Sequence, residues 1–180
     1  MGMGIKEAPT AMSAACSSTE LPMTIRPLFL AAGWYLGREV PVPTSIAAEH
    51  TAAIVMSEFG GLRVGKSGPG KDCAASDVHF SEAYPEELIT DVWGLLLNTE
   101  LVKVGDVCSA HAALYIDAQG RYFEAGPVHD LAFAGASFGE AMEKLLLGHR
   151  LRPMLRPDQL TVMMYGEEIP ADHPSVYRYR

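Results

Sequence analysis

Residues 101–125, LVKVGDVCSAHAALYIDAQGRYFEA, decide the fold class because their apolar pattern is that of short strands. Three strand-like runs, LVKVGDV, HAALYID and RYFEA, are separated by turn residues that include Gly105, Asp117 and Gly120. Short apolar runs punctuated by glycine and aspartate are typical of consecutive antiparallel strands. Within them, IDAQGRYF predicts a hairpin that turns at residues 118–120.

Two helices are predicted before these strands, in residues 21–34 (LPMTIRPLFLAAGW) and residues 44–59 (TSIAAEHTAAIVMSEF). Gly33 supplies a C-cap for the first helix, and Gly60 and Gly61 end the second. A proline and a serine at the start of the second segment are typical of a helix N-terminus. The apolar side predicted for this second helix consists of Ile46, Ala47, His50, Ile54, Val55 and Phe59.

A third helix is predicted in residues 86–98, EELITDVWGLLLN, between the first helices and the strand-rich stretch. Glu86 and Glu87 lie in its first turn, where negative charge is favourable. Apolar residues then recur at helical spacing. The predicted buried face consists of Leu88, Val92, Leu95 and Leu96.

A fourth helix is predicted in residues 138–148, FGEAMEKLLLG, after the strands. Ser137 is a favourable N-cap, and Glu140 three residues later completes a capping box. Gly148 is placed where a C-cap glycine is expected. This segment therefore carries both a start and a stop signal.

Helices, then a meander of strands, then a helix indicate a single α+β domain with a mostly antiparallel sheet flanked by helices. Strand and helix do not alternate as a parallel nucleotide-binding sheet requires. We expect a flexible leader in residues 1–20, the domain in residues 21–148, and a C-terminal extension in residues 149–180 that could pack on the domain. LTVMMY (160–165) is a candidate extra strand in that extension.

Composition narrows the functional classes. The chain has 180 residues, of which 48% are hydrophobic, and no apolar run is long enough to span a bilayer. A net charge of -8 argues against nucleic-acid binding, although it suits a basic partner. Three scattered cysteines, Cys16, Cys73 and Cys108, do not form a disulfide scaffold, and with no apolar signal segment they favour the cytoplasm.

Residues 60–67, GGLRVGKS, match the phosphate-loop pattern G-x-x-x-x-G-K-[ST]. Such a loop works when it joins a buried strand to a helix whose N-terminus faces the phosphates. Here a predicted helix precedes Gly60, and the helix breakers of residues 68–70 follow. The glycines therefore have a sufficient role in ending the preceding helix, and a nucleotide-dependent enzyme acting through Lys66 is kept only as an alternative.

Four potential zinc ligands are present, since Cys108 and His111 are three residues apart and Cys73 and His79 could join them. Their loops would have to converge, and free thiols with an ordinary surface histidine explain the same residues. A zinc-dependent enzyme is thus a second alternative. We predict no catalytic, cofactor-binding or metal-binding residue.

An acidic cluster lies at and before the start of the third predicted helix. It consists of Glu82, Glu86, Glu87 and Asp91. The cluster is explained either as a solvated face or as a docking face that attracts a basic protein by electrostatic steering. These four residues are our candidate partner-binding site.

Five landmarks in order carry a family resemblance. They are AAGWYLGREV (31–40), EFGGL (58–62) followed by GPG (68–70), LVKVGDV (101–107), ALYIDAQGRYF (113–123) and FGEAMEKLLLG (138–148). In order and spacing they resemble the SUKH superfamily, and most of all its third group. The resemblance covers residues 21–148.

The resemblance implies an α+β binding module of bacterial immunity type that carries no catalytic residues. Such proteins neutralise toxins of polymorphic secretion systems, often nucleases or deaminases, by stoichiometric binding. Trp34 would be a core anchor, and Asp117, Gly120 and Tyr122 would form the family's hairpin. We therefore expect a cytoplasmic, non-enzymatic inhibitor of a cognate toxin with a basic surface, that binds neither nucleic acid nor membrane. A scaffold for a non-toxin protein is a further alternative.

Overall fold

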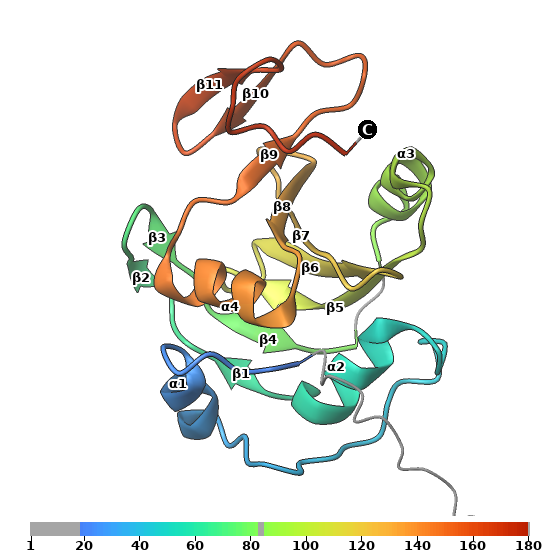
Figure 1. Cartoon of the computed structure of the whole chain (residues 1–180), viewed down its shortest axis with the longest axis vertical. Coiled ribbons are helices and arrows are strands. Elements are labelled where there is room, and N and C mark those ends of the chain that lie inside the picture. The colour runs from blue at the N-terminus through green and yellow to red at the C-terminus, as the bar shows by residue number, and fades with distance from the viewer. Residues whose placement is uncertain (1–18, 83–84, 180) are drawn as a thin grey trace, which may run out of the picture.

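A seven-stranded sheet forms the centre of the computed structural model, which describes residues 19–82 and 85–179 (Figure 1). Its strand order is β1-β4-β5-β6-β7-β8-β9, and every neighbouring pair is antiparallel. The predicted α+β class with a mostly antiparallel sheet is therefore confirmed. Most of the predicted leader, including Cys16, lies outside the described residues.

The central sheet, two small hairpins and five helical segments make up the described secondary structure. The central strands are β1 (Arg63–Val64), β4 (Val78–Phe80), β5 (Leu101–Val107), β6 (Ala112–Asp117), β7 (Tyr122–Ala125), β8 (Leu131–Gly135) and β9 (Arg152–Met154). Two small hairpins are formed by β2 (Gly68–Pro69) with β3 (Ala74–Ala75), and by β10 (Thr161–Met164) with β11 (Glu167–Pro170). The helices are α1 (Arg26–Ala31), α2 (Thr51–Phe59), the π-helix η1 (Leu88–Trp93), α3 (Gly94–Leu97) and α4 (Phe138–Leu147).

One face of the sheet packs against α1, α2 and α4 through a cluster of phenylalanines. Phe29 comes from α1, Phe59 from α2, Phe80 from β4 and Phe138 from the start of α4, and all four are fully buried. The rings of Phe59 and Phe138 stack with centroids 4.5 Å apart. Trp34 is also buried in this core, which confirms its expected structural role.

The other face is covered by η1, α3 and the last described residues of the chain. Trp93 is fully buried there and lies edge-on to Tyr179, with ring centroids 5.6 Å apart. Tyr177 stacks on Phe133 of β8 at 3.9 Å. The C-terminal segment thus contributes β9 to the sheet and aromatic side chains to its second core.

Two central strands, β8 and β9, were not predicted. All five residues of β8, LAFAG, are buried, so the strand lacks the alternation that marks a half-exposed strand. In β9, Pro153 cannot donate a hydrogen bond within a ladder, which restricts the strand to the sheet edge that it occupies. LTVMMY does form a strand, β10, but it pairs with β11 outside the central sheet.

The second helix is shorter than predicted. It begins at Thr51, because the Nδ1 atom of His50 accepts a hydrogen bond from the backbone N–H of Ala52 at 3.1 Å and caps the helix there. His50 is therefore a buried cap, and Ile54, predicted on the apolar side, is 48% exposed. The predicted end at Gly60 is correct.

The predicted buried face of residues 86–98 is only half correct, because Val92 and Leu96 are partly buried and Leu96 packs against the second core. Leu88 and Leu95 are exposed, Leu95 by 83%, whereas Ile89 and Trp93 are buried. This segment has apolar residues on several sides, and its largest side chain, Trp93, is the one that packs on the sheet. The π-helical hydrogen bonding of η1 also changes the spacing on which the prediction relied.

Several local predictions are confirmed. The Ser137 hydroxyl accepts from the backbone N–H of Glu140 at 3.3 Å, and Gly148 ends α4 in the left-handed conformation with φ of 70°. The β6–β7 hairpin turns where expected, with Gly120 at φ of 80°. After Lys66 the chain enters the short strand β2, in the place where a phosphate loop needs a helix. Within the described residues, no helix is long and apolar enough to cross a membrane.

We predict that Phe59→Ala lowers the free energy of unfolding by about 3–5 kcal/mol, because it removes a ring that contacts three other phenylalanines. Urea denaturation followed by circular dichroism measures this change. As a control, Leu95→Ala on the exposed side of α3 should change stability by less than about 0.5 kcal/mol. Equal effects of the two substitutions would show that this cluster is not the core.

Candidate functional site

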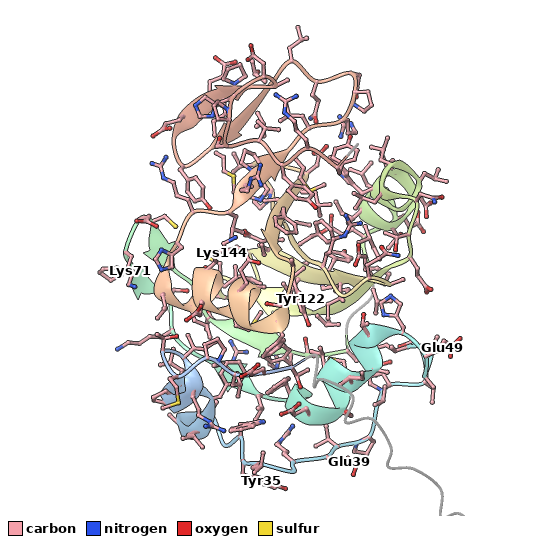
Figure 2. The ribbon with its side chains drawn as sticks, viewed as in Figure 1. Tyr35, Glu39, Glu49, Lys71, Tyr122 and Lys144 are labelled. Carbon is pink, nitrogen blue, oxygen red and sulfur yellow. The ribbon has the colours of Figure 1, made fainter. Side chains whose placement is uncertain are left out.

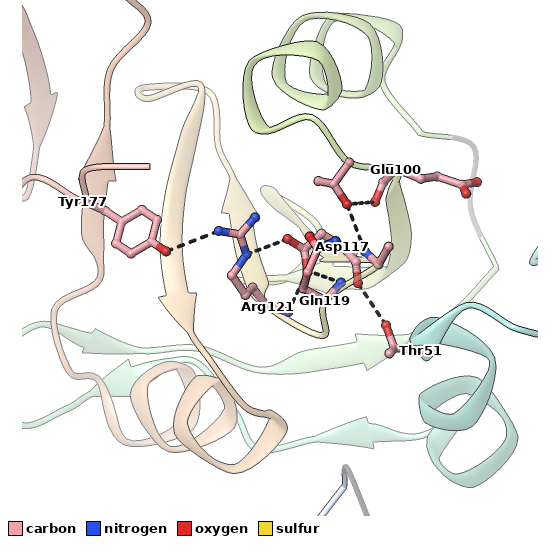
Figure 3. A network of polar contacts seen from close by, with 8 residues as sticks. Thr51, Glu100, Asp117, Gln119, Arg121 and Tyr177 are labelled. Carbon is pink, nitrogen blue, oxygen red and sulfur yellow. Dashed lines mark hydrogen bonds and ion pairs between the residues drawn. The ribbon is translucent and has the colours of Figure 1, made fainter. Parts of the chain in front are cut away.

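A buried carboxylate, that of Asp117 at the end of β6, organises the region around the candidate site (Figure 3). Its Oδ1 accepts hydrogen bonds from the backbone N–H groups of Gln119 at 3.0 Å and Arg121 at 2.8 Å. Its Oδ2 lies 2.7 Å from Nε of Arg121. The β6–β7 turn is therefore closed by side-chain contacts as well as by backbone pairing.

The same turn is hydrogen-bonded to the start of α2 and to the segment before β5 (Figure 3). Thr51 at the start of α2 donates from Oγ1 to the carbonyl oxygen of Asp117 at 2.9 Å. The backbone N–H of Ala118 donates to Oγ1 of Thr99, just before β5, at 3.2 Å. These bonds fix the N-terminus of α2 and the start of β5 relative to the hairpin.

The four predicted acidic residues all lie on the surface. Glu82 follows β4, Glu86 and Glu87 precede η1, and Asp91 lies within η1. The backbone N–H of Glu86 donates to the hydroxyl of Tyr115 at 3.0 Å, which ties the entry to η1 to the sheet. The carboxylates of Glu86, Glu87 and Asp91 therefore face solvent from an anchored segment, whereas Glu82 accepts a hydrogen bond from Ser45 Oγ at 3.1 Å.

A hollow of about 690 Å³ lies next to these residues. It is lined by Ser45, Ile46, Glu82, Pro85, Thr90, Glu100, Leu101, Val102 and Lys103. The structure thus brings Glu82 together with Glu100, which the sequence analysis did not identify. Asp91 lines an adjoining depression that shares Thr90, while Glu86 and Glu87 line neither. No signal in the sequence separates Glu100 from other surface glutamates.

These five carboxylates, Glu82, Glu86, Glu87, Asp91 and Glu100, are named here the acidic surface. In the described part of the chain none of them forms an ion pair, although other acidic side chains do. The basic residue of the hollow, Lys103, is bound to Asp106 at 2.9 Å. The acidic surface therefore keeps its negative charge available to a partner.

The candidate metal ligands are not assembled. Over residues 19–82 and 85–179, no three histidine, cysteine, aspartate or glutamate side chains are grouped so that they could hold a metal ion. Cys73 and Cys108 are free thiols that line a different hollow, and His79 lies on β4 with Nδ1 3.4 Å from Arg63. The zinc alternative thus gains no support from the geometry.

The chain thus combines an α+β fold with exposed carboxylates that form no ion pair with any described residue. The family model described as SUKH-3 immunity protein matches residues 22–148, well over half of the chain. The chain belongs to the SUKH-3 immunity protein family, which confirms the resemblance seen in the sequence. Neither the curated proteins nor the solved structures compared with the chain gave a match.

We expect Asp117→Asn to lower the free energy of unfolding by about 2–4 kcal/mol, because Arg121 loses its counter-ion and two charge-assisted bonds weaken. The exposed Asp91→Asn removes the same charge and should cost less than about 0.5 kcal/mol. Urea titrations of both variants at neutral pH make the comparison. Similar small losses would mean that the buried carboxylate does not organise this region.

Proposed function

We propose that this chain is an immunity protein that neutralises a cognate bacterial protein toxin by stoichiometric binding, without catalysis of its own. The observation that carries the proposal is the family match over residues 22–148. The unpaired acidic surface supports it, because a binding protein needs charge that is not consumed by internal ion pairs. Free thiols at Cys73 and Cys108 are in keeping with action in the cytoplasm.

The partner we propose is a toxin with a basic surface, of the kind that nucleases and nucleic-acid deaminases use to hold phosphates. A protein of net charge -8 is attracted to such a surface over long range. The same charge disfavours binding to nucleic acid directly. An acidic inhibitor can therefore compete with the toxin's substrate for one basic surface.

The candidate contact region is the acidic surface together with the hollow beside it. Ile46, Leu101 and Val102 give the hollow apolar lining, and Glu82 and Glu100 add carboxylates. Apolar contacts with charged groups around them are typical of protein interfaces. We propose that the toxin's basic residues contact the carboxylates while an apolar side chain enters the hollow.

Co-expression tests the proposed function directly. The toxin domain encoded beside this chain's gene is expressed in a bacterial host with and without the chain. We expect growth to be restored and a one-to-one complex to be recovered by size-exclusion chromatography. Full lethality with no complex would contradict the proposal. A complex that forms without protection would favour the scaffold alternative.

The contact region has its own test in the double variant Glu86→Lys/Glu87→Lys. Reversing two exposed charges should slow association with the toxin by roughly 10–100-fold at low salt, with a smaller difference at high salt. Biolayer interferometry at several salt concentrations measures the rates.

The matched control is Glu39→Lys/Asp172→Lys, which changes the net charge equally. Both residues are exposed, and Asp172 follows β11, whereas Glu39 lies in the segment between α1 and α2 (Figure 2). This variant should retain most of the association rate. An equal loss in both variants would show that net charge alone, and not the acidic surface, accelerates binding.

A further inference from the structure

A second hollow, of about 340 Å³, lies on the face of the sheet that α4 covers and is lined by none of the residues of the acidic surface. Glu124 on β7 lines it, because Tyr122 and Glu124 point to one face of the strand while Phe123 packs on the other. Lys144 and Leu145 of α4 form one wall, and Figure 2 shows Lys144 on this helix. The turn between β10 and β11 forms another wall.

The carboxylate of Glu124 is largely buried and accepts no hydrogen bond from any described residue. The Nε2 atom of His129 lies 4.0 Å from the Oε2 atom of Glu124, at the limit of an ion pair. That Nε2 atom is itself buried without a hydrogen-bond partner among the described residues. Buried polar atoms in native proteins normally have a hydrogen-bond partner, so this unpartnered Nε2 atom, beside a carboxylate that accepts no hydrogen bond from a described residue, points to a ligand.

Three of the other polar groups that line the hollow are already engaged. On α4, Lys144 Nζ binds Glu140 at 2.7 Å, and after that helix His149 Nδ1 lies 2.8 Å from Asp72. From the β10–β11 turn, the Tyr165 hydroxyl accepts from the backbone N–H of Leu151 at 2.7 Å. The remaining titratable groups of the lining are the free thiols of Cys73 and Cys108.

The charge states of the unpaired groups follow from burial. Burial raises the pKa of Glu124 to about 7 and lowers the pKa of His129. A neutral imidazole that carries its proton on Nδ1 offers Nε2 as an acceptor. In that tautomer the hollow presents two acceptors around neutral pH, a carboxylate that can ionise and a ring nitrogen, and neither accepts a hydrogen bond from a described residue.

The walls limit the kind of ligand. Val128, Leu145, Leu151 and Met164 are apolar lining residues, and they suit an alkyl stem. The volume lies at the lower end of ligand pockets, about 300–1,000 Å³, which suits one side chain better than a nucleotide cofactor. An arginine combines such a stem with five donors in a planar fork that fits a carboxylate.

We propose that this hollow holds an arginine side chain of the bound toxin, with its guanidinium group against Glu124 and His129. That the arginine comes from a toxin rests on the proposed function. The hollow that would bind it is formed only by residues of this chain. The acidic surface attracts the toxin, and the arginine hollow provides a buried anchor, the kind of contact that dominates binding energy.

A small probe tests the site without the toxin. N-acetyl-arginine methylamide is titrated into the full chain at pH 8 and followed by NMR chemical shifts. We expect saturable binding with a dissociation constant on the order of millimolar, as for one anchoring side chain. The neutral citrulline derivative of the same shape should not bind, because it cannot pair with the carboxylate.

The variant Glu124→Gln should weaken binding of the arginine probe by about tenfold or more. The control Glu143→Gln removes a charge from α4 outside the hollow, where Glu143 accepts a hydrogen bond from Thr24, and should leave binding unchanged. Equal affinity in wild type and Glu124→Gln, or no saturable shift with the arginine probe, would overturn the proposal. Equal affinity for the lysine derivative would overturn the choice of arginine.

Binding of the arginine probe by a chain that gives no protection against the toxin would reject the proposed function but not the arginine site.

Proton release gives a second readout. The guanidinium group needs an ionised Glu124, whose pKa of about 7 must fall on binding. Affinity for the arginine probe should therefore rise between pH 6 and pH 8, and calorimetry in buffers of different ionisation enthalpy should detect protons released near pH 6.5. Binding that is independent of pH, with no proton release, would contradict a contact to Glu124.

The free protein should show the same titration. Because the folded-state pKa of Glu124 lies above its ordinary value of 4.5, its stabilising contribution is complete below about pH 4.5 and is lost as the pH rises through 7. Glu124→Gln cannot ionise, so its melting temperature should exceed that of wild type by several degrees at pH 8 and match it near pH 5. A difference that does not change with pH would contradict the burial of this carboxylate.

Discussion

The pairing of the buried Asp117 carboxylate with Arg121 and with two backbone N–H groups is the constraint on which the rest of this structure depends. A buried ion costs several kcal/mol of desolvation, and removal of one partner would leave that cost without compensation. The turn that it closes also receives Thr51 from α2 and binds Thr99 before β5. The turn closed by this buried charge thus joins the hairpin to the start of α2 and the start of β5, next to the hollow beside the acidic surface.

The exposed carboxylates have the opposite arrangement, and this contrast supports a binding role. Asp117 is buried and fully paired, whereas Glu82, Glu86, Glu87 and Asp91 are exposed and form no ion pair with any described residue. Because the chain belongs to the SUKH-3 immunity protein family, we propose that these exposed carboxylates bind a basic toxin. Glu124 adds a third case, a buried carboxylate whose partner we place on the toxin.

Much of the fold could be predicted from local signals, because turns and helix ends depend on nearby residues. Asp117 and Gly120 identified the hairpin, and Ser137 with Gly148 bounded α4. The strand β8 was missed because both faces of the sheet cover it, which removes the alternation. The turn at residues 108–110, in which all three residues have positive φ, was not predicted either. It depends on a residue distant in sequence, because the carboxylate of Asp77 accepts a hydrogen bond from the backbone N–H of Ser109 at 2.8 Å. Glu124 and Glu100 owe their importance to tertiary neighbours that a single sequence does not reveal.

Hydrogen–deuterium exchange of the chain, free and bound to its toxin, tests the central claim most directly, namely that the acidic surface is the contact region. We expect slower exchange on binding in residues 85–103, which include η1, α3 and the start of β5. Peptides of α1, far from this region, should exchange at unchanged rates. Protection confined to α1, or none in residues 85–103, would contradict it.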